Sequence, residues 1–198
     1  MDIRKVIGQM VFITMITSGI SFAGTYDLEV NASHSAIEGR LDKTMTIERG
    51  LLTAGVGALY NDDDYLIGNV KLTLGNGISL PELRFNLGFK GVVGNVEKGQ
   101  KDGDLTAIGF LLLGKYSIPE TISPIPIDVS VGFSYAPDSL CFSDSDRYVD
   151  FKASLDFRIV QNSAIVLGYR YIKVRFDENG GPWEMSDDAV FVGIQLGF

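Results

Sequence analysis

The sequence has one cysteine, one histidine and one tryptophan among its 198 residues. Cys141 has no partner in the chain, so an intramolecular disulfide is excluded as a source of stability. Basic residues are also few, with 17 Lys and Arg against 25 Asp and Glu. Because a phosphate backbone needs a basic surface, the net charge of −8 argues against nucleic acid as a partner.

Long hydrophobic runs are absent beyond the N-terminus, which excludes a helical membrane protein, since a spanning helix needs about 20 apolar residues. The N-terminal run, residues 6–20, falls short of that length. It follows Arg4 and Lys5 and precedes the small residues Ser21 and Ala23. These features predict a cleaved secretory signal over residues 1–23 and one mature domain over residues 24–198.

Proline is scarce, at 6 residues, whereas glycine is abundant, at 23, and aromatic residues are common. This composition favours strands joined by turns. Apolar residues occupy every second position in residues 83–89, 127–135, 151–159 and 190–198, which is the period of a strand with one apolar face. Ten such segments are predicted, at residues 25–31, 35–42, 50–60, 65–74, 82–92, 105–116, 127–135, 148–160, 164–175 and 188–198.

A β-sandwich also alternates, so strand length decides between the two classes. Sandwich strands have about five or six residues, whereas a strand tilted across a bilayer needs about 9 to 11. The sequence therefore predicts an all-β fold, a transmembrane antiparallel up-and-down β-barrel of about ten strands. The first two segments are weak and leave eight strands as an alternative. Residues 108–113 are apolar on both faces, so the register of their segment is open.

The connections are assigned by placing Phe198 on the periplasmic side. The outer loops are then residues 61–64, 97–104, 136–147 and 177–187, and the periplasmic connections are residues 43–49, 75–81, 117–126 and 161–163. Aromatic residues near the outer loops are expected to form the outer aromatic girdle. They are Tyr135, Tyr148, Tyr169, Tyr171 and Trp183.

The alternation also assigns charges to the lumen, eight acidic and seven basic. A near-balanced interior predicts a network of ion pairs that fills a narrow lumen, because a buried charge is costly without a partner. Arg170 is expected either at the centre of this network or as a gating or solute-binding guanidinium. The network is predicted to include Glu82, Arg84, Lys90, Asp128, Asp150, Lys152, Asp156, Arg158 and Arg170. The other lumen charges are Asp27, Glu29, Glu38, Arg40, Asp42 and Lys71.

Four motifs carry a resemblance to a known family. They are Leu59-Tyr60-Asn61-Asp62-Asp63, Tyr135-Ala136-Pro137-Asp138-Ser139-Leu140, Gly168-Tyr169-Arg170-Tyr171-Ile172 and Val192-Gly193. With these motifs the chain resembles the YfaZ family of predicted outer-membrane proteins. The resemblance implies a barrel in the bacterial outer membrane and brings no catalytic residues.

The last segment ends on an aromatic residue after alternate apolar positions, the pattern expected of a client of the barrel-assembly machinery. Outer-membrane lipid and lipopolysaccharide are the other expected partners, and a monomer is expected. The pattern comprises Val190, Val192, Ile194, Leu196 and Phe198.

Candidate chemistry is sparse. His34 could join the acidic residues 62–64 in an omptin-like surface enzyme, and the same acids could bind Ca²⁺, although they lack the spacing of a calcium loop. Cys141 is expected to be an unreactive thiol. No catalytic residue, metal or cofactor is therefore predicted, and the leading function is a structural barrel or a small gated channel. The alternatives are the omptin-like enzyme and a soluble periplasmic ligand-binding β protein.

Overall fold

The computed structural model describes residues 24–48, 50–62, 64–76, 82–98, 101–119, 121–123, 125–178 and 181–198. The predicted signal segment lies outside the described residues. No helix among the described residues is long and apolar enough to cross a membrane.

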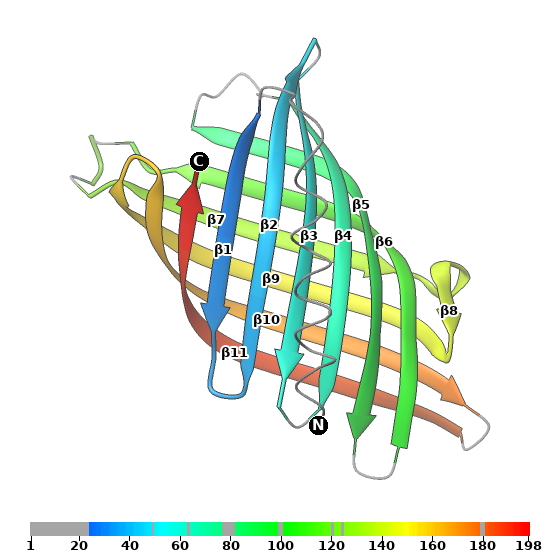
Figure 1. Ribbon diagram of the computed structural model, residues 1–198. Helices are drawn as coiled ribbons and strands as arrows, with labels where there is room; N and C mark the ends of the chain where they lie inside the picture. The colour runs from blue at the N-terminus through cyan, green and yellow to red at the C-terminus, as the bar shows by residue number, and fades with distance from the viewer. Residues whose placement is uncertain are drawn as a thin grey trace.

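Ten long strands form one closed antiparallel ring, in which each strand pairs with its neighbour along the chain and β1 pairs with β11 (Figure 1). This confirms the predicted ten-stranded barrel, so the eight-strand alternative is wrong. The strands of the ring are β1 (Thr25–Ala32), β2 (Ala36–Ile47), β3 (Gly50–Asn61), β4 (Tyr65–Asn76), β5 (Leu83–Lys98), β6 (Lys101–Ser117), β7 (Ile127–Ala136), β9 (Ser145–Val160), β10 (Ser163–Glu178) and β11 (Gly181–Gly197).

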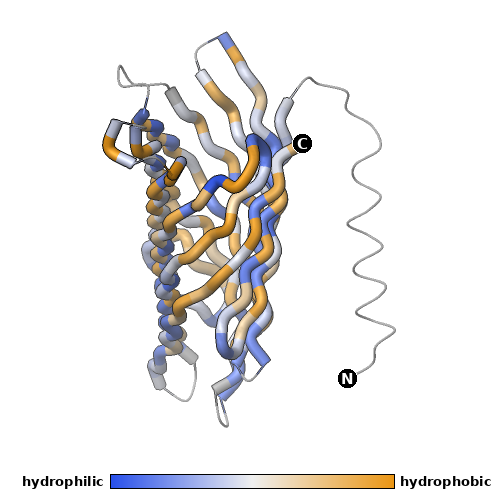
Figure 2. The backbone as a smooth tube through the Cα atoms, turned by 90° about the vertical axis from the view of Figure 1, so that its left-hand side faces the viewer, coloured by the Kyte–Doolittle hydropathy of each residue, from blue (hydrophilic) through white to orange (hydrophobic). Residues whose placement is uncertain are grey.

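The period-2 pattern sets the two faces of the wall, because successive side chains of a strand point to opposite sides. Outward-facing apolar residues are widely exposed, such as Leu87 at 63% and Val190 at 67%. Figure 2 shows hydrophobic and hydrophilic residues alternating along the strands. An exposed apolar belt around a closed barrel is the exterior that a bilayer requires. It is incompatible with a soluble protein.

The structure also settles the open register of β6. Leu105 and Ala107 are each 1% exposed, whereas Ile108 and Phe110 are 44% and 54% exposed. Odd-numbered residues of β6 therefore face the lumen.

The C-terminus and the start of β1 lie at one end of the barrel, and the β1–β2 turn lies at the other (Figure 1). Following the placement of Phe198, the first of these is called the periplasmic end and the second the outer end. The connections from β4 to β5 and from β6 to β7 at the periplasmic end are longer than the short turns usual on that side.

Two predicted outer loops are wrong. The β5–β6 ladder continues to the pair Lys98 and Lys101, and the β10–β11 ladder continues to Glu178 and Gly181. Residues 97–104 and 177–187 are therefore mostly strand. They carry charged residues at outward positions. The strand prediction relied on apolar outward residues, so it assigned these segments to loops.

A short segment completes the wall at the outer end, where β7 stops before its neighbours. The helical turn η1 (Asp138–Leu140) leads into β8 (Cys141–Ser143), which pairs with β6. Ser145 fastens it, since its Oγ donates to the carbonyl oxygens of Phe142 and Thr106 at 2.7 and 3.0 Å. Burial, reinforced by the nearby carboxylates of Asp146 and Asp138, raises the pKa of the Cys141 thiol. A raised pKa keeps the thiol protonated and unreactive.

Candidate functional site

The lumen contains two layers, which differ in the type of side chain that the strands turn inward. The periplasmic part is lined by charged and polar side chains, and the outer part is filled by apolar ones. Both layers are built on the same ladders.

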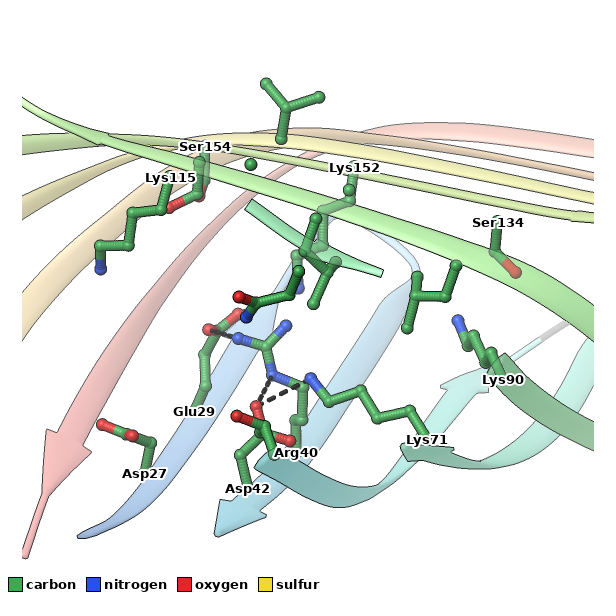
Figure 3. Close-up of a pocket in the computed structure, with 18 of the residues that line it drawn as sticks. Asp27, Glu29, Arg40, Asp42, Lys71, Lys90, Lys115, Ser134, Lys152 and Ser154 are labelled. Atoms are coloured by element: carbon green, nitrogen blue, oxygen red, sulfur yellow. Dashed lines mark hydrogen bonds and ion pairs between the residues drawn. The ribbon is translucent and has the colours of Figure 1, made fainter. Parts of the chain in front are cut away.

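Arg40 lies at the centre of the ionic layer, on β2. Its guanidinium donates to Glu29 on β1 at 2.5 Å and pairs with Asp42 at 3.2 Å, while Lys71 on β4 reaches Asp42 at 2.8 Å (Figure 3). Gly55 on β3 leaves the space for these groups. A Cβ atom there would lie 2.0 Å from Asp42 Oδ1.

Lys152 on β9 joins this cluster from the other side of the lumen. Its ammonium lies 2.9 Å from Glu29 and 2.7 Å from Glu38. Lys90 on β5 pairs in the same way with Asp150 on β9. Each of these pairs crosses the barrel between strands that are not neighbours, so the ion pairs brace the wall from within.

The periplasmic mouth has a second group of charges. Lys115 on β6 pairs with Asp128 at 3.1 Å and with Asp156 at 3.4 Å, and Arg158 lies 3.4 Å from Asp128. Ser130 and Ser154 each donate to Asp156 at 2.8 Å. These contacts hold the carboxylates against the wall.

Arg170 connects the ionic layer to the apolar one. It is 3% exposed, and it lies 3.8 Å from Glu38, 3.7 Å from Asp187 and 3.5 Å from the Tyr65 hydroxyl. Tyr65 in turn donates a hydrogen bond to Asp187. This position is that of a structural centre between the layers.

The motif around Arg170 has a steric explanation. Gly168 lies under the ring of Phe191, and a Cβ atom there would be 2.4 Å from Phe191 Cζ. Lys152 lies over the other part of the same ring, 4.8 Å from its centroid. Glycine at position 168 therefore leaves room for the Phe191 ring, which Lys152 also contacts.

The apolar layer, called the plug below, fills the outer end of the lumen. Phe176 and Trp183 stack at its centre, with ring centroids 4.3 Å apart. Gly103 on β6 lies against this stack, since a Cβ atom there would be 2.8 Å from Phe176. The plug comprises Ala36, Leu59, Tyr65, Ile67, Val92, Val96, Leu105, Ala107, Ala136, Tyr148, Ile172, Val174, Phe176, Trp183 and Met185.

The polarity of the wall reverses at the level of the plug. On β10, Ile172, Val174 and Phe176 face inward, whereas Lys173 and Arg175 face outward, with side chains 38% and 41% exposed. Charged side chains on the outer surface belong in water, not in hydrocarbon. On β10 the wall beside the plug therefore projects beyond the lipid, whereas on β4 and β5 the outward neighbours of plug residues, Leu66 and Val93, are apolar and 50% and 58% exposed.

A cavity of about 360 Å³ occupies the ionic layer, and none of the described plug residues lines it. A second space of about 220 Å³ shares Asp27, Lys115 and Gln195 with it and reaches Phe198 at the periplasmic end. The lumen is thus a blind polar cavity that opens toward the periplasm.

The predicted network residues occupy different parts of this arrangement. Arg84, Lys90, Asp150, Lys152, Asp156 and Arg170 line the cavity, and Asp128 and Arg158 line its mouth. Glu82 lies in the turn before β5 and makes no ion pair with any described residue.

The sequence prediction missed two residues of the lumen charge network, Lys115 and Asp187. Lys115 is the one cation in residues 105–116. Because a charged side chain in this segment must face the lumen and not lipid, Lys115 could have fixed the register of β6. Asp187 was assigned to a loop, although it lies four residues before Phe191 on β11 and therefore faces the lumen as Phe191 does.

The expected aromatic girdle is partly wrong. Tyr148 and Trp183 are 1% and 8% exposed and belong to the plug. Tyr169, Tyr171 and Tyr135 lie on the outward face. The error arises because polarity reverses at the outer end, where inward positions become apolar.

His34 is exposed in the β1–β2 turn and makes no hydrogen bond or ion pair with any described residue. The neighbouring acidic turn contacts this turn through its backbone, since the Asp62 N–H donates to the Ser35 carbonyl at 3.1 Å. The Asp62 carboxylate accepts from the Tyr60 hydroxyl at 2.9 Å. Asp63 lies outside the described residues.

A family model described as YfaZ precursor matches residues 9–198. The chain belongs to the YfaZ family. The resemblance seen in the motifs is confirmed. With its apolar belt, this YfaZ member is a β-barrel of the bacterial outer membrane.

Solved structures with a similar arrangement include two described as the KdgM porin and the NanC porin. Their sequence identities are 12% and 8% and their TM-scores 0.43 and 0.42, and each match covers 88% of this chain and 99% of the other. The Acinetobacter baumannii outer membrane protein Omp33 has 8% identity and a TM-score of 0.38, with 88% and 98% covered. A comparison with curated proteins found no match.

Proposed function

We propose that this protein is a non-enzymatic outer-membrane barrel whose lumen is closed at rest, a structural barrel that conducts only if its plug is displaced. The observation that carries the proposal is the plug itself. Phe176, Val174 and Val96 are each 0% exposed at the outer end of the lumen. An apolar constriction without water is a barrier to ions.

The ionic layer supports the same proposal. A pore that selects ions displays charge of one sign, whereas here Lys152, Lys115 and Arg40 each contact two carboxylates. Paired charges across the lumen hold the wall together and leave little excess of either sign. The lumen of a barrel of this size is narrow enough for side chains to fill it.

Single-channel recording tests the proposal. Refolded wild-type protein is expected to be electrically silent in a planar bilayer, whereas Phe176→Ala combined with Trp183→Ala is expected to conduct. The matched control removes two outward-facing aromatics that pack against each other, Phe110→Ala with Phe89→Ala, and is expected to remain silent. Heat-modifiable migration on gels verifies that each variant has folded. Steady conductance of the wild-type protein, or silence of the folded plug variant, would contradict the proposal.

The non-enzymatic part of the proposal concerns the omptin-like alternative, which requires His34. A histidine that acts as a general base is held against an orienting partner. His34 is exposed and has no such partner among the described residues. Replacement of His34 by alanine is expected to leave the folding and conductance of the barrel unchanged.

The proposal extends to the surroundings of the barrel. The final strand presents Val190, Val192, Ile194, Leu196 and Phe198 outward, with exposures between 42% and 67%. Such a row suits lipid and the barrel-assembly machinery, and lipopolysaccharide would surround the outer end. Phe198→Asp is expected to slow insertion into membranes that contain the machinery, while insertion of Phe142→Asp, a change in β8, proceeds normally.

A further inference from the structure

The periplasmic part of the lumen contains two pairs of like charges, one acidic and one basic, on separate walls of the barrel. Asp27 lies directly opposite Asp42 on the β1–β2 ladder, and Arg84 lies directly opposite Lys115 on the β5–β6 ladder. All four residues line the same cavity. Like charges directly opposite each other destabilise a sheet, so neither pair is explained by stability.

One member of each pair is neutralised by the protein. Asp42 pairs with Arg40 and Lys71, and Lys115 pairs with Asp128 and Asp156. The acidic and basic side chains of the lumen ion pairs therefore balance without Asp27 and Arg84.

The other member of each pair is left over. Neither Asp27 nor Arg84 lies within ion-pair distance of an opposite charge among the described residues. The one side-chain hydrogen bond to Asp27 comes from Gln195 at 3.4 Å. Asp27 therefore presents a carboxylate, and Arg84 a guanidinium, to the same space.

The two leftover charges lie on different walls of the barrel. In the ring, β3 and β4 separate the pairs on one side, and β7, β9, β10 and β11 on the other. Figure 3 shows Asp27 and Lys115 on separate walls of the cavity. An anionic wall and a cationic wall thus face each other across about 360 Å³, a volume that suits a small ligand.

Buried polar atoms add hydrogen-bonding capacity to the same cavity. Asp42 Oδ1, Ser134 Oγ and Arg170 Nε are buried, and none has a hydrogen-bond partner among the described residues. Their residues line the cavity from β2, β7 and β10. Unsatisfied buried polar groups are costly, so polar contents suit this cavity better than apolar ones.

We propose that this cavity binds a small zwitterion from the periplasmic side, with its cationic end at Asp27 and its anionic end at Arg84. A simple anion would leave Asp27 unpaired, and a simple cation would leave Arg84 unpaired. A zwitterion satisfies both without changing the charge of the lumen. The plug closes the far end, so the ligand enters and leaves by the periplasmic mouth.

The test uses refolded barrel in detergent micelles and isothermal titration with ω-amino acids from 4-aminobutyrate to 8-aminooctanoate. Each is compared with the carboxylate and the alkylammonium of the same chain length, and with erythritol as a neutral polyol. The tightest ω-amino acid is expected to bind at least about tenfold more tightly than either of its matched ions, because each end makes a charge-assisted contact. The chain length of the tightest ligand reports the separation of the two charges.

Two variants assign the ends of the ligand. Asp27→Asn is expected to weaken the ω-amino acid and the alkylammonium about tenfold and to leave the carboxylate unchanged. Arg84→Gln is expected to weaken the ω-amino acid and the carboxylate and to leave the alkylammonium unchanged. The swap Asp27→Arg with Arg84→Asp keeps the ω-amino acid, bound in reverse. Asp62→Asn and Arg147→Gln remove charges outside the cavity and serve as controls.

Equal binding of ω-amino acids and their matched ions would overturn the proposal. So would tighter binding of erythritol, no binding of any ligand by the folded protein, or variants without effect. Binding is measured on the barrel in micelles, so it is independent of conductance. A conducting wild-type protein would therefore contradict the closed barrel and leave the binding site standing, and the converse also holds.

Discussion

The outer and periplasmic parts of the lumen share one strand geometry and differ in the side chains that the strands turn inward. In the periplasmic part, charged residues such as Lys152 and Glu29 pair across the lumen and leave a cavity between them. In the outer part, Phe176, Trp183 and their neighbours are buried against one another. The difference teaches that the same strand geometry can enclose a polar cavity or an apolar plug, depending on which residues occupy the inward positions.

The exterior changes in the opposite sense. Around the polar cavity the outward residues are apolar, as Val190, Val192 and Leu87 show, and around the plug they include Lys173 and Glu184, which pair at 2.7 Å. The reversal is local to β10 and β11, since on β4 and β5 the outward residues beside the plug, Leu66 and Val93, are still apolar and exposed. Three substitutions, each with a control, and one fluorescence measurement test that difference.

The largest effect is expected from the plug. Phe176→Ala removes a fully buried ring and leaves a cavity that the rigid wall cannot close, so the free energy of unfolding should fall by about 4 kcal/mol. Urea unfolding of the refolded barrel in vesicles measures this loss. Phe110→Ala, which removes an outward ring that is 54% exposed, serves as the control, since lipid can fill the space. Equal losses for the two variants would contradict the dry plug.

A smaller loss is expected in the ionic layer. Lys152→Met removes the cation shared by Glu29 and Glu38 and leaves them only Arg40 and Arg170 as partners, at a cost of about 3 kcal/mol in the free energy of unfolding. Lys152→Arg keeps the charge and should retain most of the stability. The same vesicle unfolding assay applies. If Lys152→Met were as stable as the wild type, the ion pairs would not brace the wall.

The smallest of these effects is expected from one glycine in the seal. Gly103→Ala places a methyl group 2.8 Å from Phe176 and should cost about 2 kcal/mol of unfolding free energy through overpacking. Gly39→Ala is the matched control, because a Cβ atom there meets nothing within 4 Å. Thermal unfolding followed by circular dichroism compares the two. A stable Gly103→Ala protein would mean that the plug has space to spare.

Much of the barrel can be predicted from sequence, because alternation is a local property of each strand. All ten strands were placed, and Lys90, Asp150, Lys152 and Arg170 were assigned inward positions that the structure also gives them. Local patterns succeed where the outside is lipid, since every outward residue must then be apolar.

The plug could not be predicted in the same way, because its recognition needs the level of the membrane surface. Ile172, Val174 and Phe176 alternate with Tyr171, Lys173 and Arg175 as regularly as residues in the bilayer do. The period is the same, and only the meaning of the two faces is reversed. Arg170 stands at the boundary, and its contact with Asp187 depends on a neighbour whose strand extends beyond the lipid-facing segment.

Trp183 provides the most direct test of the central claim, which is that the outer end of the lumen is sealed and dry. It is the one tryptophan in the sequence, and it is 8% exposed beneath Phe176 in the plug. The fluorescence of the unmodified barrel in vesicles can therefore be measured during titration with iodide. A sealed plug predicts blue-shifted emission and little quenching. Emission near that of tryptophan in water, with quenching close to that of the unfolded protein, would contradict it.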